Sequence, residues 1–294
     1  MIAHPNNTEV AYADTQPSLT RLNIETGQPI AKLTITDISC MQYNDDGSLL
    51  LYGIDSSNDT VHECNIWDLR SNTIIRSLPN FSTSVQAQWD PKENKYVATC
   101  SDKLLQIWDM RNAKSPIAAI TTPMQVYQPC YVGKDAGLVL CSAENQFVAV
   151  SKFFDSNPKV DYYDLYGKKT KDNQPLPMPK QLEFPPFCVK VVPQAASKIV
   201  ASLDDASCQI VGFDLNNEAN SFHFKNPNVT ENGGFITTLA CSPDGKTMAS
   251  AGSASSRLNI WDISAGKSDG EAVPATSWRY NLMPQKSMLQ CEIQ

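Results

Sequence analysis

The chain has 294 residues, of which 41% are hydrophobic and 19% charged, and its 24 basic and 31 acidic residues give a formal net charge of −7. A chain of this size can bury a large core. It contains no stretch of 18 apolar residues and no start typical of a signal peptide. The acidic balance disfavours nucleic-acid binding, because phosphates are repelled unless basic residues gather in one patch. We therefore expect a cytoplasmic or nuclear protein without membrane association.

Polar turns recur along the chain at even spacing, each after an apolar stretch. In chain order they are His4–Asn7, Asn44–Gly47, Asp90–Asn94, Gly133–Ala136, Pro193–Ala196 and Ser242–Gly245. Pro, Asp, Asn and Gly favour tight reversals, and short apolar runs such as Ser48–Tyr52 and Tyr96–Cys100 follow the turns. This pattern predicts antiparallel sheets built from hairpins.

A short signature ends a predicted strand about 20 residues after each turn. Its strong copies are Ile66–Arg70 (IWDLR), Ile107–Arg111 (IWDMR) and Ile260–Ser264 (IWDIS); in the weak copies Leu22, Val150 and Phe213 take the place of the Trp. The intervals between the six equivalent positions are 45, 41, 42, 63 and 48 residues. Four of them are close to the roughly 40–45 residues of one propeller blade. The fifth indicates one blade plus an insertion.

Because the polar turns and the Trp-Asp signature recur with the same period, the chain resembles a WD-repeat β-propeller from Met1 to about Gly266. The resemblance implies an all-β fold of four-stranded antiparallel blades, with six repeats counted, in one domain over residues 1–294. The signature residues are then structural, with the tryptophans packed between blades: Trp67, Asp68, Trp108, Asp109, Trp261 and Asp262. Residues 267–294 are expected to be a closing strand or a tail. Either Pro274–Tyr280 is the outer strand that completes the first blade, or the chain is truncated and belongs to a seven-bladed ring.

Two features depart from the family pattern. The Gly-His dipeptide that often opens such repeats is absent. An acidic residue six positions before the Trp place occurs only at Asp102 and Glu144, whereas Asp14, Asp59 and Asp205 lie eight positions before it. We expect longer turns in the three blades that contain Asp14, Asp59 and Asp205.

The long interval predicts an inserted loop over residues 151–186. It contains several prolines, which disfavour a regular sheet, and a basic run formed by Lys168, Lys169 and Lys171. Loops on a rigid scaffold are preferred places for binding specificity. The run is therefore a candidate partner contact, with a merely solvated loop as the alternative.

No catalytic or metal-binding pattern is found. The three histidines lie in different repeats, and no Gly-x-Ser-x-Gly motif occurs. Gly245-Lys246-Thr247 lacks the earlier glycine of a phosphate-binding loop. None of the nine cysteines pairs as Cys-x-x-Cys, and we expect them to be reduced and mostly buried. We expect no cofactor and no enzymatic activity.

The resemblance implies a scaffold that binds other proteins. Arg70 and Arg111 close two Trp-Asp-x-Arg motifs in adjacent repeats, as in the substrate receptors that dock on the adaptor of cullin-type ubiquitin ligases. Planar guanidinium groups suit carboxylates and carbonyls of a partner. The alternative is that each Arg only pairs with a neighbouring Asp. We therefore predict a non-enzymatic interaction scaffold, with a ligase substrate receptor as the second hypothesis.

Overall fold

The computed structural model describes the chain except residues 14–16, 36, 56–61, 79–80, 92–93, 133–136, 144, 166, 177–187, 196, 204–208, 226–235, 253–256, 264–275, 281–290 and 294. The described residues form twenty-five strands and one short 3-10 helix, η1 (Lys171–Asn173). None of the described helices has the length and hydrophobicity needed to cross a membrane. The expected all-β fold is confirmed.

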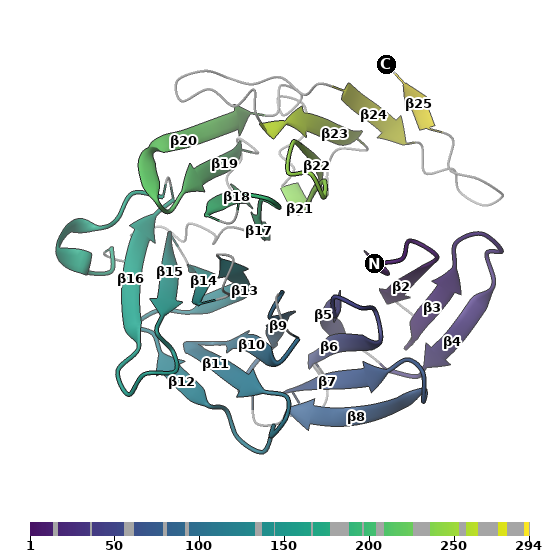
Figure 1. Cartoon of the computed structure of the whole chain (residues 1–294). Coiled ribbons are helices and arrows are strands. Elements are labelled where there is room, and N and C mark those ends of the chain that lie inside the picture. Colours follow the sequence, from purple (N-terminus) through teal and green to yellow (C-terminus); the bar gives the residue numbers. More distant parts are fainter. Residues whose placement is uncertain are drawn as a thin grey trace. The chain divides into compact units, whose positions relative to one another are not determined.

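The strands form six antiparallel sheets, numbered here in chain order (Figure 1). Sheet 1 contains β1 (Ile2–Ala3), β2 (Glu9–Ala13), β3 (Leu19–Asn23) and β4 (Pro29–Leu33). Sheet 2 contains β5 (Ile38–Tyr43), β6 (Leu49–Asp55), β7 (His62–Asp68) and β8 (Thr73–Leu78). Sheet 3 contains β9 (Gln86–Trp89), β10 (Tyr96–Ser101), β11 (Leu104–Asp109) and β12 (Ala118–Thr121).

Sheet 4 contains β13 (Val126–Val132), β14 (Leu138–Ala143), β15 (Gln146–Ser151) and β16 (Lys159–Asp164). Sheet 5 contains β17 (Cys188–Val191), β18 (Lys198–Ser202), β19 (Gln209–Asp214) and β20 (Asn217–Lys225). Sheet 6 contains β21 (Ile236–Cys241), β22 (Thr247–Gly252), β23 (Arg257–Asp262), β24 (Thr276–Tyr280) and β25 (Cys291–Ile293). Two compact units contain these sheets: residues 1–141 with 150–159, and residues 142–149 with 160–294.

The predicted polar turns join the first and second strands of their sheets. In sheet 2 the Asn44 Oδ1 accepts a hydrogen bond from the Leu49 N–H at 2.8 Å, and the Asp46 Oδ1 accepts one from the Ser48 N–H at 2.7 Å. Gly47 has a φ of 73°, in the left-handed region that favours glycine. Side-chain bonds to nearby backbone thus fix the reversal, as the composition predicts. The Gly133–Ala136 turn lies outside the described residues.

The signature tryptophans are core residues, as predicted. The exposed fractions of Trp67, Trp108 and Trp261 are 0%, 2% and 0%. Each packs against the preceding sheet: Trp67 joins a cluster with Ala11 and Leu19 of sheet 1, and the other two occupy the corresponding positions against sheets 2 and 5. Because both faces of such a sheet are apolar, its burial depends on the neighbouring sheet.

Two of the three tryptophans also make a buried hydrogen bond. The Trp108 Nε1 donates to the Thr99 Oγ1 at 2.9 Å, and the Trp261 Nε1 donates to the Ser250 Oγ at 2.8 Å. Each Trp is paired with a residue of the second strand. The acceptor lies two residues further along that strand. The same place opposite Trp67 holds Tyr52, and in the described part of the chain neither the Trp67 Nε1 nor the Tyr52 Oη has a partner.

Glutamine side chains connect the first strands of sheets 2, 3 and 4. The Trp89 N–H donates to the Gln42 Oε1 at 2.8 Å, and the Gln86 Nε2 donates back to the Ser39 carbonyl at 2.9 Å. The Tyr131 N–H donates in the same way to the Gln88 Oε1 at 2.9 Å. These amides satisfy backbone groups at an edge where no further strand is paired.

The strand bounds agree with the expected variation in turn length. β10 ends at Ser101 and β11 begins at Leu104, whereas β6 ends at Asp55 and β7 begins at His62. β2 and β3, and likewise β18 and β19, are also separated by longer connections. The residues within those three longer connections are only partly described.

One expectation about the C-terminal segment is wrong. Of the two alternatives, the one in which Pro274–Tyr280 is the outer strand of the first blade is contradicted, because β24 pairs with β23 of sheet 6, with Arg257 opposite Arg279. Sheet 1 already has its own outer strand, because β4 pairs with β3. Pairing of strands that are consecutive in the chain closes a shorter loop, which costs less conformational entropy.

Replacing Thr99 with Val should destabilise the protein, because the Trp108 Nε1 would be left buried without an acceptor. The expected loss is about 1–3 kcal/mol in the free energy of unfolding, measured by urea titration. Tyr52→Phe is the matched control. It removes a buried hydroxyl that has no partner in the described part of the chain, and should be neutral or slightly stabilising. Equal losses in the two variants would contradict the assigned role of Thr99.

Candidate functional site

The signature Asp residues build the turns that carry Arg70 and Arg111. The Asp68 Oδ1 accepts hydrogen bonds from the N–H groups of Arg70 and Ser71, at 2.9 and 3.0 Å. The Asp109 Oδ1 accepts the equivalent bond from the Arg111 N–H at 2.9 Å. The two arginines therefore occupy the same position after the third strands of sheets 2 and 3, as predicted.

The guanidinium of Arg111 is held within its own sheet. Its Nε and Nη2 donate to Asp109 at 2.9 and 2.6 Å, and its Cζ lies 5.9 Å from the centre of the Tyr96 ring. The hydrogen bonds from Arg111 lower the pKa of Asp109, and the Asp109 carboxylate raises the pKa of Arg111. The side chain of Arg111 nevertheless stays 62% exposed. Pairing with the neighbouring Asp is thus the observed state of this arginine.

An exposed aromatic ring extends the surface around Arg111. The ring centres of Tyr96 and Phe154 lie 5.0 Å apart, and Phe154 is 59% exposed although Phe153 beside it is buried. Arg111, Tyr96 and Phe154 form what we call the rim ledge. Sequence reasoning did not select the two aromatic residues. The available signal was that Phe153 and Phe154 follow Val150-Ser151, in the turn equivalent to the one that holds Arg111.

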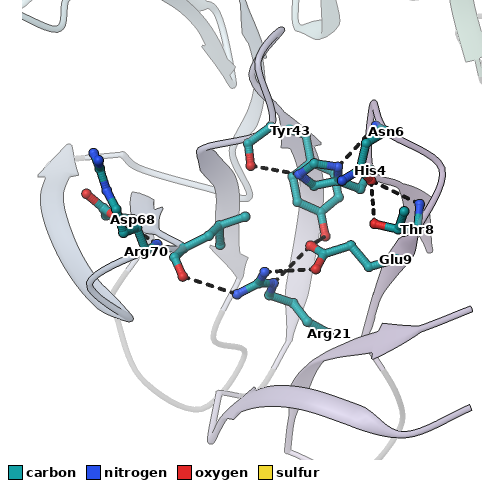
Figure 2. A network of polar contacts seen from close by, with 10 residues as sticks. His4, Asn6, Thr8, Glu9, Arg21, Tyr43, Asp68 and Arg70 are labelled. Carbon is teal, nitrogen blue, oxygen red and sulfur yellow. Dashed lines mark hydrogen bonds and ion pairs between the residues drawn. The ribbon is translucent and has the colours of Figure 1, made fainter. Parts of the chain in front are cut away.

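The turn of Arg70 is anchored by a buried ion pair in sheet 1 (Figure 2). Arg21 donates from Nε and Nη2 to the two carboxylate oxygens of Glu9, at 3.0 and 2.8 Å, and from Nη1 to the Leu69 carbonyl at 3.5 Å. The Tyr43 hydroxyl donates to the Glu9 Oε1 at 3.0 Å. Burial, and then the Glu9 charge, raise the pKa of Tyr43.

Two further contacts complete this network. The Cζ of Arg21 lies 5.6 Å from the centre of the Trp67 ring, and the His4 Nε2 forms a hydrogen bond of 2.9 Å with the Gly47 carbonyl. Figure 2 shows that the Arg70 side chain points away from the ion pair. Arg70 is exposed. The network therefore fixes the backbone beneath Arg70 and leaves its guanidinium available to a partner.

The described part of the expected insertion packs against sheet 4. Residues 151–186 contain the outer strand β16. After it, the backbone of Lys169 forms an antiparallel β-bridge with Tyr163. The Asn173 side chain then takes the place of a paired strand: its Oδ1 accepts from the Tyr162 N–H at 3.1 Å, and its Nδ2 donates to the Val160 carbonyl at 2.8 Å. This segment covers the edge of β16, which limits pairing with other chains.

The three lysines of the insertion have different environments. The Lys169 Nζ donates to the buried Asp161 at 2.7 Å, whereas Lys168 and Lys171 are exposed. Lys168 and Lys171 are thus the members of the predicted basic run that a partner can reach directly. The end of the insertion, residues 177–187, lies outside the described residues.

The comparisons with known proteins identify the repeats. The model of the family "WD domain, G-beta repeat" matches residues 72–109 and 226–262. The chain thus contains WD repeats of this family. The two matched stretches end with Trp108-Asp109 and Trp261-Asp262, the two signatures whose Trp bonds a hydroxyl on the second strand. No curated protein sequence matches the propeller significantly.

Solved propellers are similar to this one in fold. A chain in the crystal structure of the mitotic checkpoint complex matches with a TM-score of 0.65 and 17% identity, over 89% of this chain and 72% of that one. U3-55K and the WD40 repeats of RRP9 each match with a TM-score of 0.65 and 12% identity, over 89% of this chain and 76% and 74% of theirs. At these identities the likeness concerns the fold alone.

The described surface carries an arginine beside aromatic groups. Among the residues that the structure describes, no group of three or more His, Cys, Asp or Glu side chains is placed to hold a metal ion. The rim ledge combines an arginine with aromatic rings, the residue types that most often dominate binding energy at protein interfaces.

Replacing Arg111 with Ala should raise the pKa of Asp109 toward its ordinary value, because the bonds from Arg111 are the main cause of its lowered pKa. The Asp109 carboxyl carbon should therefore titrate at higher pH in an NMR experiment. Arg70→Ala is the matched control. The pKa of Asp68 is lowered mainly by the Ser71 N–H and should move less. Equal shifts would argue against the distinct states assigned to the two arginines.

Replacing Arg21 with Met should leave the Glu9 charge buried and unpaired. The side chains of Arg21 and Glu9 are only 10% and 8% exposed. The expected loss is about 3–5 kcal/mol in the free energy of unfolding, measured by chemical denaturation. Adding Glu9→Gln should recover part of this loss, and Arg76→Met on the exposed strand β8 should have little effect. A loss no larger than that of Arg76→Met would show that the ion pair does not support the Arg70 turn.

Proposed function

We propose that this propeller is a non-enzymatic scaffold that binds other proteins through the rim ledge and Arg70, with Lys168 and Lys171 as a second contact. WD-repeat propellers generally serve as interaction scaffolds. One of the similar folds belongs to a multiprotein assembly, the mitotic checkpoint complex. Both facts support protein binding as the general role, and the contact residues come from this chain's own surface.

The observation that carries the proposal is the exposed Phe154 ring, which packs at a tilt against Tyr96 beside Arg111. A large apolar side chain that is 59% exposed gains free energy when a partner covers it. The rings and the guanidinium are already held in place by contacts within the protein. Little side-chain entropy is therefore lost on binding, which favours affinity.

A second candidate function is that of a substrate receptor for a cullin-type ubiquitin ligase. It is favoured by the equivalent positions of Arg70 and Arg111 after their third strands. An adaptor that bound Arg111 would have to share the guanidinium with Asp109, whereas Arg70 is directly accessible. This hypothesis therefore predicts a larger contribution from Arg70 than from Arg111.

Affinity purification of the full chain with quantitative mass spectrometry tests both functions. The ledge variant Arg111→Ala with Phe154→Ser should lower the recovery of specific partners more than tenfold, the effect expected of an interface hot spot. Lys168→Glu with Lys171→Glu tests the second contact without deleting Asn173, which covers the edge of β16. Lys32→Ala with Arg76→Ala, on the outer strands of sheets 1 and 2, is the control.

The outcomes separate the hypotheses. Equal recovery of every partner by the ledge variant and the control would remove the ledge from the proposal. Recovery of the ligase adaptor by the wild type and its loss with Arg70→Ala would support the receptor function. Absence of the adaptor from the wild-type sample would exclude that function and leave the general scaffold.

A further inference from the structure

Two buried thiols from neighbouring sheets lie in contact. Cys100 is on β10 of sheet 3 and Cys141 is on β14 of sheet 4, and their sulfur atoms are 3.2 Å apart. Each residue is only 1% exposed. The two cysteines are 41 residues apart in the chain, so their proximity comes from the packing of one sheet on the next. Both are free thiols in the structure.

The pair differs from two cysteines of sheet 2, the partly buried Cys40 and the buried Cys64. Cys40 and Cys64 lie on either side of Gly53 in sheet 2, each directly opposite it. Two strand spacings amount to roughly 9.5 Å between their Cα atoms. That separation exceeds the limit of about 7 Å for a disulfide without backbone movement. Cys40 and Cys64 therefore provide an internal comparison.

We propose that Cys100 and Cys141 are a site of oxidative modification, at which a hydroperoxide converts the two thiols into a disulfide that joins sheets 3 and 4. One thiolate attacks the peroxide and becomes a sulfenic acid, with release of one water from hydrogen peroxide. The second sulfur then displaces the sulfenic oxygen, which leaves as a second water. Two thiols and one peroxide thus give one disulfide and two waters.

The environment makes this reaction slow and selective. Burial, and next the hydrogen bond with Cys141, raise the pKa of Cys100. Since the thiolate is the reactive form, oxidation should be faster at pH 8.5 than at pH 7. A small oxidant is favoured because the sulfurs are enclosed by core side chains. Once one sulfur is oxidised, the other is already in contact with it.

The disulfide would link two sheets that are otherwise held together by packing and by the Gln88 amide. Closing a loop of this length restricts the unfolded chain and stabilises the folded state. The oxidised protein should therefore unfold at a temperature higher by roughly 5 °C or more. Oxidation would make the part of the propeller that carries the rim ledge more rigid.

Peptide mapping of the full-length wild-type protein tests the proposal without any variant. The folded protein is treated with hydrogen peroxide at pH 8.5, alkylated in denaturant and digested with trypsin under non-reducing conditions. Cys100 and Cys141 fall in separate tryptic peptides, 96–103 and 135–152, and neither contains another cysteine. The expected product is the linked pair of these peptides, lighter by two hydrogens than their sum and separated by reduction.

Variants provide the stability test. Cys100→Ser should abolish both the linked peptide and the oxidation-dependent rise in unfolding temperature, whereas Cys64→Ser should keep both. Two results would overturn the proposal: Cys100 and Cys141 remain fully alkylated after the peroxide treatment, or they appear only as separate sulfinic or sulfonic acids. Cys40 and Cys64 share the tryptic peptide 33–70, and loss of two hydrogens from that peptide at the same rate would show that the oxidation is not selective for Cys100 and Cys141.

Discussion

The structure depends on the burial of one large side chain, in four of its sheets, against the sheet before it. A four-stranded sheet with two apolar faces cannot bury both of them by itself. Trp67, Trp108 and Trp261 fill this position in three sheets, and Phe213 fills it in sheet 5, where its ring lies 5.1 Å from Phe147 of sheet 4. The signature in the sequence therefore recurs at the same interval as this packing contact between sheets.

Polar bonds between sheets vary along the chain while this apolar contact persists. Sheets 1 and 2 are joined by the hydrogen bonds from Tyr43 to Glu9 and from Arg21 to the Leu69 carbonyl, and sheets 2, 3 and 4 by glutamine amides. In sheets 3 and 6 the Trp bonds a hydroxyl within its own sheet, and the family model matches those two repeats. Repeats without this hydroxyl keep the fold because hydrophobic burial contributes more than one hydrogen bond.

The candidate surface results from the same construction. The Asp that follows Trp67, and likewise the one that follows Trp108, accepts a hydrogen bond from a backbone N–H two residues on and so gives Arg70 and Arg111 the same local position. Neighbouring sheets then make the two sites different. Arg21 of sheet 1 supports the turn of Arg70, and Phe154 of sheet 4 extends the surface beside Arg111. A repeated motif thus presents two chemically distinct contacts.

The sequence by itself determined the sheets, the polar turns, the buried tryptophans and the positions of Arg70 and Arg111, because these follow from local hydrogen bonding and from a period of about 42 residues. Only the tertiary structure decided which side chains meet across sheets: Tyr43 against Glu9, Phe154 beside Tyr96, and Cys100 against Cys141. It also assigned β24 to sheet 6 and Asn173 to the edge of β16. These contacts join residues whose spacing has no pattern of its own, since they depend on how one sheet packs on the next.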